Sequence, residues 1–255
     1  MKVLLLGATG NIGSRLIPAL LAHHHSVVAY VRSPSKLQSL LPATLHEQIL
    51  VVQGDATDSA AIKRAILEHR CEAVVSAAGV AALAPWSHGD LPVIFKAVVE
   101  GVRAAGAEGG KMLRLWVMGG QGVLKYPGTG VALSKYFPIF LEHNANLALL
   151  TSLPPNTIAW SMLCPNWMVA ESRDLSLTSA TLREPLDAEA GVPPRWNDSG
   201  LKHVPLVGKT LVAAMNARRY RITLEQGAEF VAGDLENGRG EWEGKAVGVI
   251  GKGVK

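Results

Sequence analysis

The stretch Gly7-Ala8-Thr9-Gly10-Asn11-Ile12-Gly13 decides the fold, because its glycines are spaced as GxxGxxG between an apolar run and a helical pattern. The run Lys2–Leu6 before it is typical of a buried strand, and residues 12–22 have the period of an amphipathic helix. Glycine lets a chain turn tightly and approach a pyrophosphate, which then meets the N–H groups of the following helix. We therefore expect a dinucleotide-binding loop rather than a simple cluster of turn glycines, with contacts from Gly7, Thr9, Gly10, Asn11, Ile12 and Gly13.

Further apolar runs alternate with helical patterns along the chain. The runs are nearly continuous in Val, Leu, Ala and Ile, which is typical of parallel strands buried on both faces. The alternation predicts an α/β fold, a Rossmann-type doubly wound parallel sheet with helices on both faces. Strands are expected at 27–31, 49–52, 73–77, 113–118, 157–163 and 246–250, and helices at 35–41, 59–69, 91–105, 134–151, 209–217 and 224–235.

Length and composition favour one domain over residues 1–255. The chain is 48% hydrophobic and has a formal net charge of +4, which suits one sizeable core and argues against disorder. Periodicity is lost over residues 170–205, a segment that carries four prolines. We expect this segment to be a small irregular lobe or long loop that covers the ends of the strands, near the C-terminus.

Composition also argues against several other classes of protein. No run of five or more Lys/Arg occurs, so we expect no nucleic-acid partner. Cys71 and Cys164 are isolated, which favours neither a disulfide nor a zinc site, and His23-His24-His25 is interpreted as a solvated loop rather than a metal site. No apolar run reaches about 18 residues, so no membrane partner is expected. The absence of a leader pattern predicts a cytoplasmic protein. Either a monomer or a homodimer is expected.

The end of the second expected strand bears on the choice between NAD and NADP. An acidic residue there would bind the ribose 2′-hydroxyl, but the sequence reads Tyr30-Val31-Arg32-Ser33-Pro34-Ser35-Lys36. Arg32 and Lys36 offer cations to a 2′-phosphate, although they could also be ordinary surface charges. We expect NADP(H).

Small and acidic residues follow the next two strands. Asp55, before Ala56, is placed to accept from the adenine amino group, unless it only stabilises a turn. Ala77-Ala78-Gly79 would leave room for the ribose and nicotinamide at the crevice where the strand order reverses.

Together with Met118-Gly119-Gly120 and Trp160–Pro165, these residues resemble the atypical short-chain dehydrogenase/reductase superfamily, and within it the NmrA-like NAD(P)-binding branch. The resemblance covers most of the chain and is weakest over residues 170–205, which it implies to be the variable, substrate-covering segment of the family. It implies a Rossmann fold with NADP(H) preference, Gly119 at the cofactor, and Cys164-Pro165 behind the nicotinamide.

One departure from the superfamily bears on the chemistry. Typical members use a Tyr-x-x-x-Lys pair as a proton relay, but here Tyr126 is followed four residues later by Gly130, and Tyr136 by Phe140. The NmrA-like branch contains both enzymes without that tyrosine and redox sensors that do not turn the dinucleotide over.

Two residues of the expected helix 134–151 are candidates to replace the relay. Tyr136 and His143 are seven residues apart, so on one helix they would share a face across two turns. A histidine can act as a general acid near neutral pH, and a tyrosine can orient an oxygen. The alternative is that Tyr136 packs and His143 is a surface or satisfied histidine.

Candidates for the substrate wall come from segments after the strands, where open α/β sheets bind ligands. Trp86 and Trp167 could form an aromatic wall or anchor their loops. Further wall candidates are His88, Gln121 and Tyr126.

Two functions remain open at this point. One is an NADP(H)-dependent oxidoreductase, possibly an isomerase, that acts on a small apolar carbonyl, enone or quinone-like compound. The other is a non-catalytic NADP(H) sensor that regulates a partner. The lost relay favours the sensor, whereas small and aromatic residues near the nicotinamide favour the enzyme.

Overall fold

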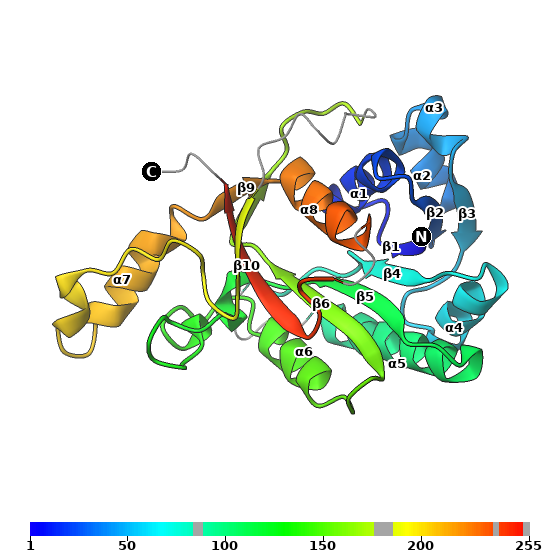
Figure 1. Ribbon diagram of the computed structural model, residues 1–255. Helices are drawn as coiled ribbons and strands as arrows, with labels where there is room; N and C mark the ends of the chain where they lie inside the picture. The colour runs from blue at the N-terminus through cyan, green and yellow to red at the C-terminus, as the bar shows by residue number, and fades with distance from the viewer. Residues whose placement is uncertain (84–88, 176–185, 237–239, 252–255) are drawn as a thin grey trace.

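A sheet of eight strands runs through the centre of the molecule in the order β3-β2-β1-β4-β5-β6-β10-β8 (Figure 1). The computed structural model describes residues 1–83, 89–175, 186–236 and 240–251. Within this range the first seven strands in that order are parallel, and β8 pairs antiparallel with β10. The strands are β1 (Lys2–Leu6), β2 (Ser26–Val31), β3 (Leu50–Gln53), β4 (Ala73–Ser76), β5 (Leu113–Met118), β6 (Ile158–Cys164), β8 (Leu186–Ala190) and β10 (Lys245–Gly251).

Helices cover both faces of this sheet (Figure 1). One face carries α1 (Asn11–Ala22), α2 (Pro34–Leu40), α3 (Ala43–His46) and α8 (Leu224–Glu236). The other face carries α4 (Ser59–Glu68), α5 (Leu91–Gly109) and α6 (Glu142–Thr151), while α7 (Gly208–Ala217) projects from the body. The arrangement confirms the predicted doubly wound α/β fold.

Strand β1 shows why the apolar runs are continuous. Leu4 and Leu6 belong to the core under α4 and α5, whereas Val3 and Leu5 belong to the core under α1 and α8. All four side chains are fully buried. Because alternate residues face opposite sides of a sheet, a strand that is covered on both sides needs an apolar residue at every position.

The strand order reverses between β1 and β4. The chain leaves β1 toward β2 and β3 on one side, and β4 begins the run toward β5 and β6 on the other. The carboxyl ends of β1 and β4 therefore border a crevice, which is where open α/β sheets bind ligands.

The helix predicted over residues 134–151 is wrong in its first half. A 3₁₀ turn, η2 (Leu133–Lys135), ends at Tyr136, and α6 begins only at Glu142. Pro138 lies between them, and a proline removes a backbone donor and disfavours helix at the residue before it. Tyr136 and His143 therefore do not share one helix face.

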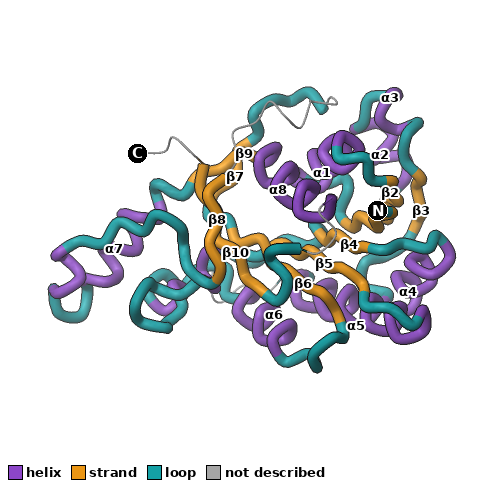
Figure 2. Tube along the Cα trace, viewed as in Figure 1, coloured by secondary structure: helices purple, strands orange, loops and turns teal. Residues whose placement is uncertain are grey.

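The segment 170–205 is not irregular throughout. Its residues Leu186–Ala190 form β8, the antiparallel edge of the main sheet. A separate two-stranded sheet pairs β7 (Trp167–Val169), just before this segment, with β9 (Arg221–Thr223), which follows α7. Figure 2 shows long loops around α7 and between β5 and α6, on the side of the sheet where β8 and β10 lie.

Candidate functional site

The glycine loop has a backbone that only glycine allows. Gly7 has a φ of +81°, and a Cβ on it would lie 2.5 Å from the carbonyl carbon of Ala77. A Cβ on Gly13 would lie 2.0 Å from the oxygen of Gly7. Missing side chains thus bring the loop close to β4 and close to the first turn of α1, as the motif predicts.

The loop ends at the amino terminus of α1. Gly10 precedes the helix, its N–H donates to the oxygen of Gly7 at 2.9 Å, and it has no side chain with which to cap the first turn. The N–H groups of that turn and the positive end of the helix dipole suit an anion. The cradle fits the pyrophosphate of a dinucleotide, which Gly7, Thr9, Gly10, Asn11, Ile12 and Gly13 would hold.

The end of β2 carries two exposed cations. Arg32 and Lys36 are exposed, and Ser33 between them caps α2 by accepting from the backbone N–H of Lys36 at 3.3 Å. Asp55, after β3, accepts from the backbone N–H of Thr57 at 2.9 Å and from its hydroxyl at 2.8 Å. These hydrogen bonds, with a contribution from the charge of Arg32, lower the pKa of Asp55. Asp55 is ionised at neutral pH, although one of its oxygens already stabilises the turn before α4.

A cleft of about 440 Å³ opens beside the start of α1. The ends of three neighbouring strands contribute small residues to it: Ala77, Ala78 and Gly79 after β4, Gly119 and Gly120 after β5, and Pro165 after β6. Ala56, by contrast, packs against the core near α4. The structure thus brings together the residues that sequence reasoning assigned to the nicotinamide end of the cofactor.

Cys164 lies behind this cleft rather than in it. Its side chain is buried, and a Cβ on Gly119 would lie 3.2 Å from its Sγ. Burial raises the pKa of the Cys164 thiol well above its usual range. A thiol that stays protonated is a poor nucleophile, so Cys164 acts as packing under Gly119.

His143 forms part of the cleft wall opposite the glycine loop. Its side chain is 8% exposed, and a Cβ on Gly120 would lie 3.0 Å from its Cδ2. Burial lowers the pKa of His143 to about 4, although the charge of Glu142 raises it. The imidazole is therefore neutral at physiological pH, which leaves it able to accept or donate one hydrogen bond but makes it a weak acid.

Glu142, next to His143, holds both ends of a loop after β4. Its Oε2 accepts from the backbone N–H of Ala82 at 2.8 Å, and its Oε1 accepts from that of Gly89 at 2.9 Å. The predicted wall residues Trp86 and His88 belong to residues 84–88, which lie outside the described residues.

Tyr126 and Tyr136 lie behind the cleft rather than on its wall. Their rings pack edge to face with centroids 5.4 Å apart, and Tyr126 is 2% exposed. Tyr126 also packs against Trp196, with 5.0 Å between the centroids. The hydroxyl of Tyr126 donates to Asp198 at 3.3 Å. A tyrosine after β5 was a reasonable candidate for the wall, but a buried aromatic cluster takes up both rings.

Trp167 points away from the cleft. Its side chain is 62% exposed, whereas its neighbours Asn166 and Met168 line the cleft. Successive side chains of an extended segment face opposite sides, so Trp167 does not face the cleft that Asn166 and Met168 line. Sequence reasoning chose the wrong member of the alternation and missed Asn166, Met168 and Ile139.

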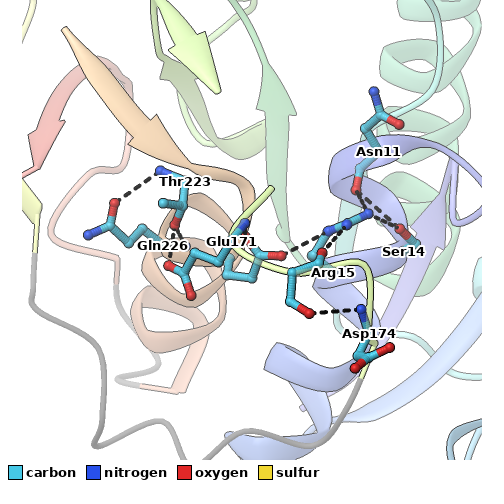
Figure 3. A network of polar contacts seen from close by, with 9 residues as sticks. Asn11, Ser14, Arg15, Glu171, Asp174, Thr223 and Gln226 are labelled. Atoms are coloured by element: carbon cyan, nitrogen blue, oxygen red, sulfur yellow. Dashed lines mark hydrogen bonds and ion pairs between the residues drawn. The ribbon is translucent and has the colours of Figure 1, made fainter. Parts of the chain in front are cut away.

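A polar network fixes residues 171–174 beside the start of α1 (Figure 3). Arg15 donates to Glu225 at 3.1 Å and to the backbone oxygen of Ser172 at 2.9 Å. Glu225 also accepts from the backbone N–H of Glu171 at 2.9 Å. The chain that follows β7 is thereby held to the helix that carries the glycine loop.

Of the three histidines after α1, His24 is exposed, but His23 and His25 are not part of a solvated loop. His23 lies between Glu229 and Glu236, at 2.6 and 2.5 Å, and His25 is buried with its Nε2 3.1 Å from the oxygen of Ala232. Among the described residues, no three or more His, Cys, Asp or Glu side chains are grouped so that they could hold a metal ion. These contacts connect α1 to α8.

The comparison with known proteins agrees with this geometry. A family model described as NAD(P)H-binding matches residues 7–189, which is more than half of the chain. The chain belongs to this NAD(P)H-binding family. The match confirms the cofactor class that the resemblance to atypical short-chain dehydrogenases/reductases implied. No curated protein matches the chain.

Solved structures share the fold. The anaerobillin reductase ChuY from Escherichia coli is 15% identical with a TM-score of 0.61, covering 100% of this chain and 99% of that chain. The oxidoreductase ylbE from Lactococcus lactis is 12% identical with a TM-score of 0.63, covering 98% and 91%. An actinorhodin polyketide ketoreductase with NADPH is 17% identical with a TM-score of 0.61, covering 98% and 95%.

None of the helices in the described residues is both long and apolar enough to cross a bilayer. The cytoplasmic location, the absence of a nucleic-acid partner and the oligomeric state stay predictions.

Proposed function

We propose that this chain is an NADP(H)-dependent oxidoreductase that reduces a small apolar carbonyl, enone or quinone-like compound. One observation carries the proposal: the start of α1 borders a cleft of about 440 Å³ that His143 and Gln121 also line. A sensor needs only the cradle, whereas this cleft continues from the residues assigned to the nicotinamide to Ile139 and His143, where a second molecule could lie.

The preference for NADP(H) rests on charge at the end of β2. Arg32 and Lys36 are exposed there, and the carboxylate of Asp55 after β3 is engaged with Thr57. A guanidinium can pair with a phosphate through two hydrogen bonds, whereas a ribose hydroxyl gains little from a cation.

Different residues of the cleft have different roles in the proposed reaction. When bound, NADPH supplies the hydride that reduces the substrate carbon. The small residues Ala78, Gly79 and Gly119 leave room for the nicotinamide, and the neutral imidazole of His143 can form a hydrogen bond with the substrate oxygen. Because the pKa of His143 is about 4, the imidazole is not an acid reservoir at neutral pH, and the proton that completes the reduction comes from water. This chemistry suits substrates that accept hydride readily.

Calorimetric titration with NADPH and NADH tests the cofactor assignment. Arg32→Glu should weaken NADPH binding by about tenfold to a hundredfold, the range for a lost charge-assisted hydrogen bond, and leave NADH binding nearly unchanged. Arg103→Glu, an exposed charge reversal on α5, is the matched control. Equal losses for both nucleotides would refute the assignment.

A panel of quinones, enones and ketones then tests turnover. NADPH oxidation by one of these classes supports the enzyme. The sensor is favoured by one observation, that no tyrosine or lysine lines the described part of the cleft. Tight NADPH binding with no oxidation across the panel, together with a sharply weaker affinity for NADP⁺, would decide for the sensor.

A further inference from the structure

A smaller side pocket adjoins the cleft. It has a volume of about 40 Å³ and shares four lining residues with the cleft, Gln121, Gly122, Ile139 and Asn166. These four shared residues belong to the segments after β5 and β6. The side pocket is closed by residues that come from elsewhere in the chain, so no local pattern in the sequence predicts it.

The walls of the side pocket are apolar. Leu133 and Phe137 come from the loop before α6, and Ala213 and Ala217 come from α7. Trp196 completes the wall, and its ring packs against Tyr126 and Tyr220 at centroid distances of 5.0 and 6.5 Å. The tyrosine cluster that sequence reasoning assigned to catalysis and the substrate wall thus supports the pocket from behind.

Asn216 on α7 fixes this wall in place. Its side chain is 2% exposed, accepts from the backbone N–H of Asn197 at 2.9 Å and donates to the backbone oxygen of Asn197 at 2.8 Å. The hydroxyl of Tyr220 donates to the oxygen of Pro194. Trp196 lies in the chain between Pro194 and Asn197, the two residues that these hydrogen bonds hold, so the pocket has a preformed shape.

Gln121 stands where the cleft meets the side pocket. Its backbone N–H donates to the oxygen of Pro165 at 2.9 Å, which holds the residue against the end of β6. Its side chain is 8% exposed, and Nε2 is buried with no hydrogen-bond partner in the described part of the chain. A buried amide without a partner is costly, and a ligand oxygen in the pocket would supply the missing acceptor when the amide turns toward it.

The volume of the side pocket limits what it can hold. A water molecule needs roughly 10–15 Å³ measured in this way, and an apolar cavity of about 150 Å³ accepts benzene. A volume of about 40 Å³ lies between these, which suits two or three carbon atoms but not an aromatic ring.

We propose that the side pocket selects the substrate: it takes a short branched aliphatic group attached to the carbonyl, whose oxygen accepts a hydrogen bond from the Gln121 amide. The inference rests on the proposed function for the reaction, but binding at the pocket can be tested without turnover. It narrows the substrate class to branched aliphatic ketones and enones and excludes compounds with an aromatic ring directly on the carbonyl.

Carboxamides are suitable probes, because they present a carbonyl oxygen and do not accept hydride. Dissociation constants of acetamide, isobutyramide and benzamide would be measured by ligand-observed NMR, with and without NADPH. Each buried carbon contributes about fourfold in affinity, so isobutyramide should bind about 15-fold more tightly than acetamide. Benzamide should bind no more tightly than acetamide.

Two variants assign the roles. Ala213→Leu fills the pocket, so isobutyramide should fall to the affinity of acetamide while acetamide itself is unaffected. Gln121→Met keeps the size but removes the amide, so both amides should bind about five- to tenfold more weakly. Thermal stability of Gln121→Met should stay equal or rise, because a buried unpaired group is removed; a merely structural glutamine would lower it. Ala107→Leu, at an exposed position of α5, is the control for the leucine.

Three outcomes overturn the proposal. Benzamide could bind more tightly than isobutyramide, or Ala213→Leu could leave the affinity for isobutyramide unchanged. In the third, Gln121→Met would weaken the binding of NADPH but not the binding of the amides. The last would place the amide on the cofactor. If the amide series and both variants behave as expected but no ketone or enone oxidises NADPH, the pocket stands and the proposed reductase activity fails.

Discussion

Replacing His143 by leucine tests whether burial keeps this imidazole neutral in the folded protein. Its pKa is lowered by burial to about 4, from an ordinary value of 6.5. The unfolded chain therefore binds a proton between these two values that the folded chain does not bind. The free energy of unfolding is therefore highest above about pH 6.5, where the imidazole is neutral in both states, and it decreases as the pH falls toward 4. From pH 7.5 to pH 5 the loss is about 2 kcal/mol, at 1.36 kcal/mol per unit below the unfolded pKa.

Urea unfolding of the wild type and His143→Leu at pH 7.5 and pH 5 measures this loss. The wild type should lose about 2 kcal/mol more than the variant between the two pH values. His23 and His25 are present in both proteins, so their own titrations cancel in the difference. His203→Leu, an exposed position, is the control and should lose as much as the wild type. Equal losses for the wild type and His143→Leu would refute the neutral imidazole, and with it the conclusion that the proton comes from water.

Three other substitutions follow from the packing. Gly13→Ala places a methyl group 2.0 Å from a backbone oxygen of the same loop, so calorimetry should find NADPH binding abolished. Asp234→Ala leaves the buried guanidinium of Arg114 without its carboxylate, now at 2.6 Å, and should cost about 3–5 kcal/mol in urea unfolding. Burial would lower the pKa of His23, but hydrogen bonds to two carboxylates on α8 outweigh it and raise the pKa, so this stabilisation is complete below about pH 6.5. The stability that His23→Gln loses should therefore shrink as the pH rises through the raised value, as thermal unfolding at pH 6 and pH 9 would show.

The sheet could be predicted because its strands are set by local patterns. The strands of the parallel part begin and end within about one residue of the predicted bounds. β7 and β9 have three residues each, too few for a period to appear. β8 carries Asp187 and Glu189, which an edge strand with a solvent-facing side tolerates but a buried run does not. β8 pairs with β10, a strand far along the sequence, so no local pattern predicts this pairing.

The cofactor half of the site could be predicted for the same local reason. A glycine cradle needs its glycines at fixed spacing, so Gly7 and Gly13 reveal it in any context. The substrate half could not, because Ala213 on α7 and Trp196 in the loop before it meet the residues after β5 at the side pocket only through tertiary packing. The aromatic residues after β5 were misplaced because a pattern gives their position in the chain but not whether the ring turns toward the core, as Tyr126 does.

The amino terminus of α6 explains how the site can work without the usual relay. The two carboxylate oxygens of Glu142 accept hydrogen bonds from the backbone N–H groups of Ala82 and Gly89. His143, the next residue, lines the cleft in an apolar setting. A tyrosine relay needs a nearby cation to lower the tyrosine pKa, and no lysine or arginine lines the described part of this cleft. A site without such a charge gives little stabilisation to a developing alkoxide, so under the proposed function it would reduce only carbonyls whose negative charge is delocalised or promptly protonated by water. The conjugated enone should therefore turn over faster than the saturated ketone of the same shape, and the reverse order would mean that an acid outside the described residues completes the site.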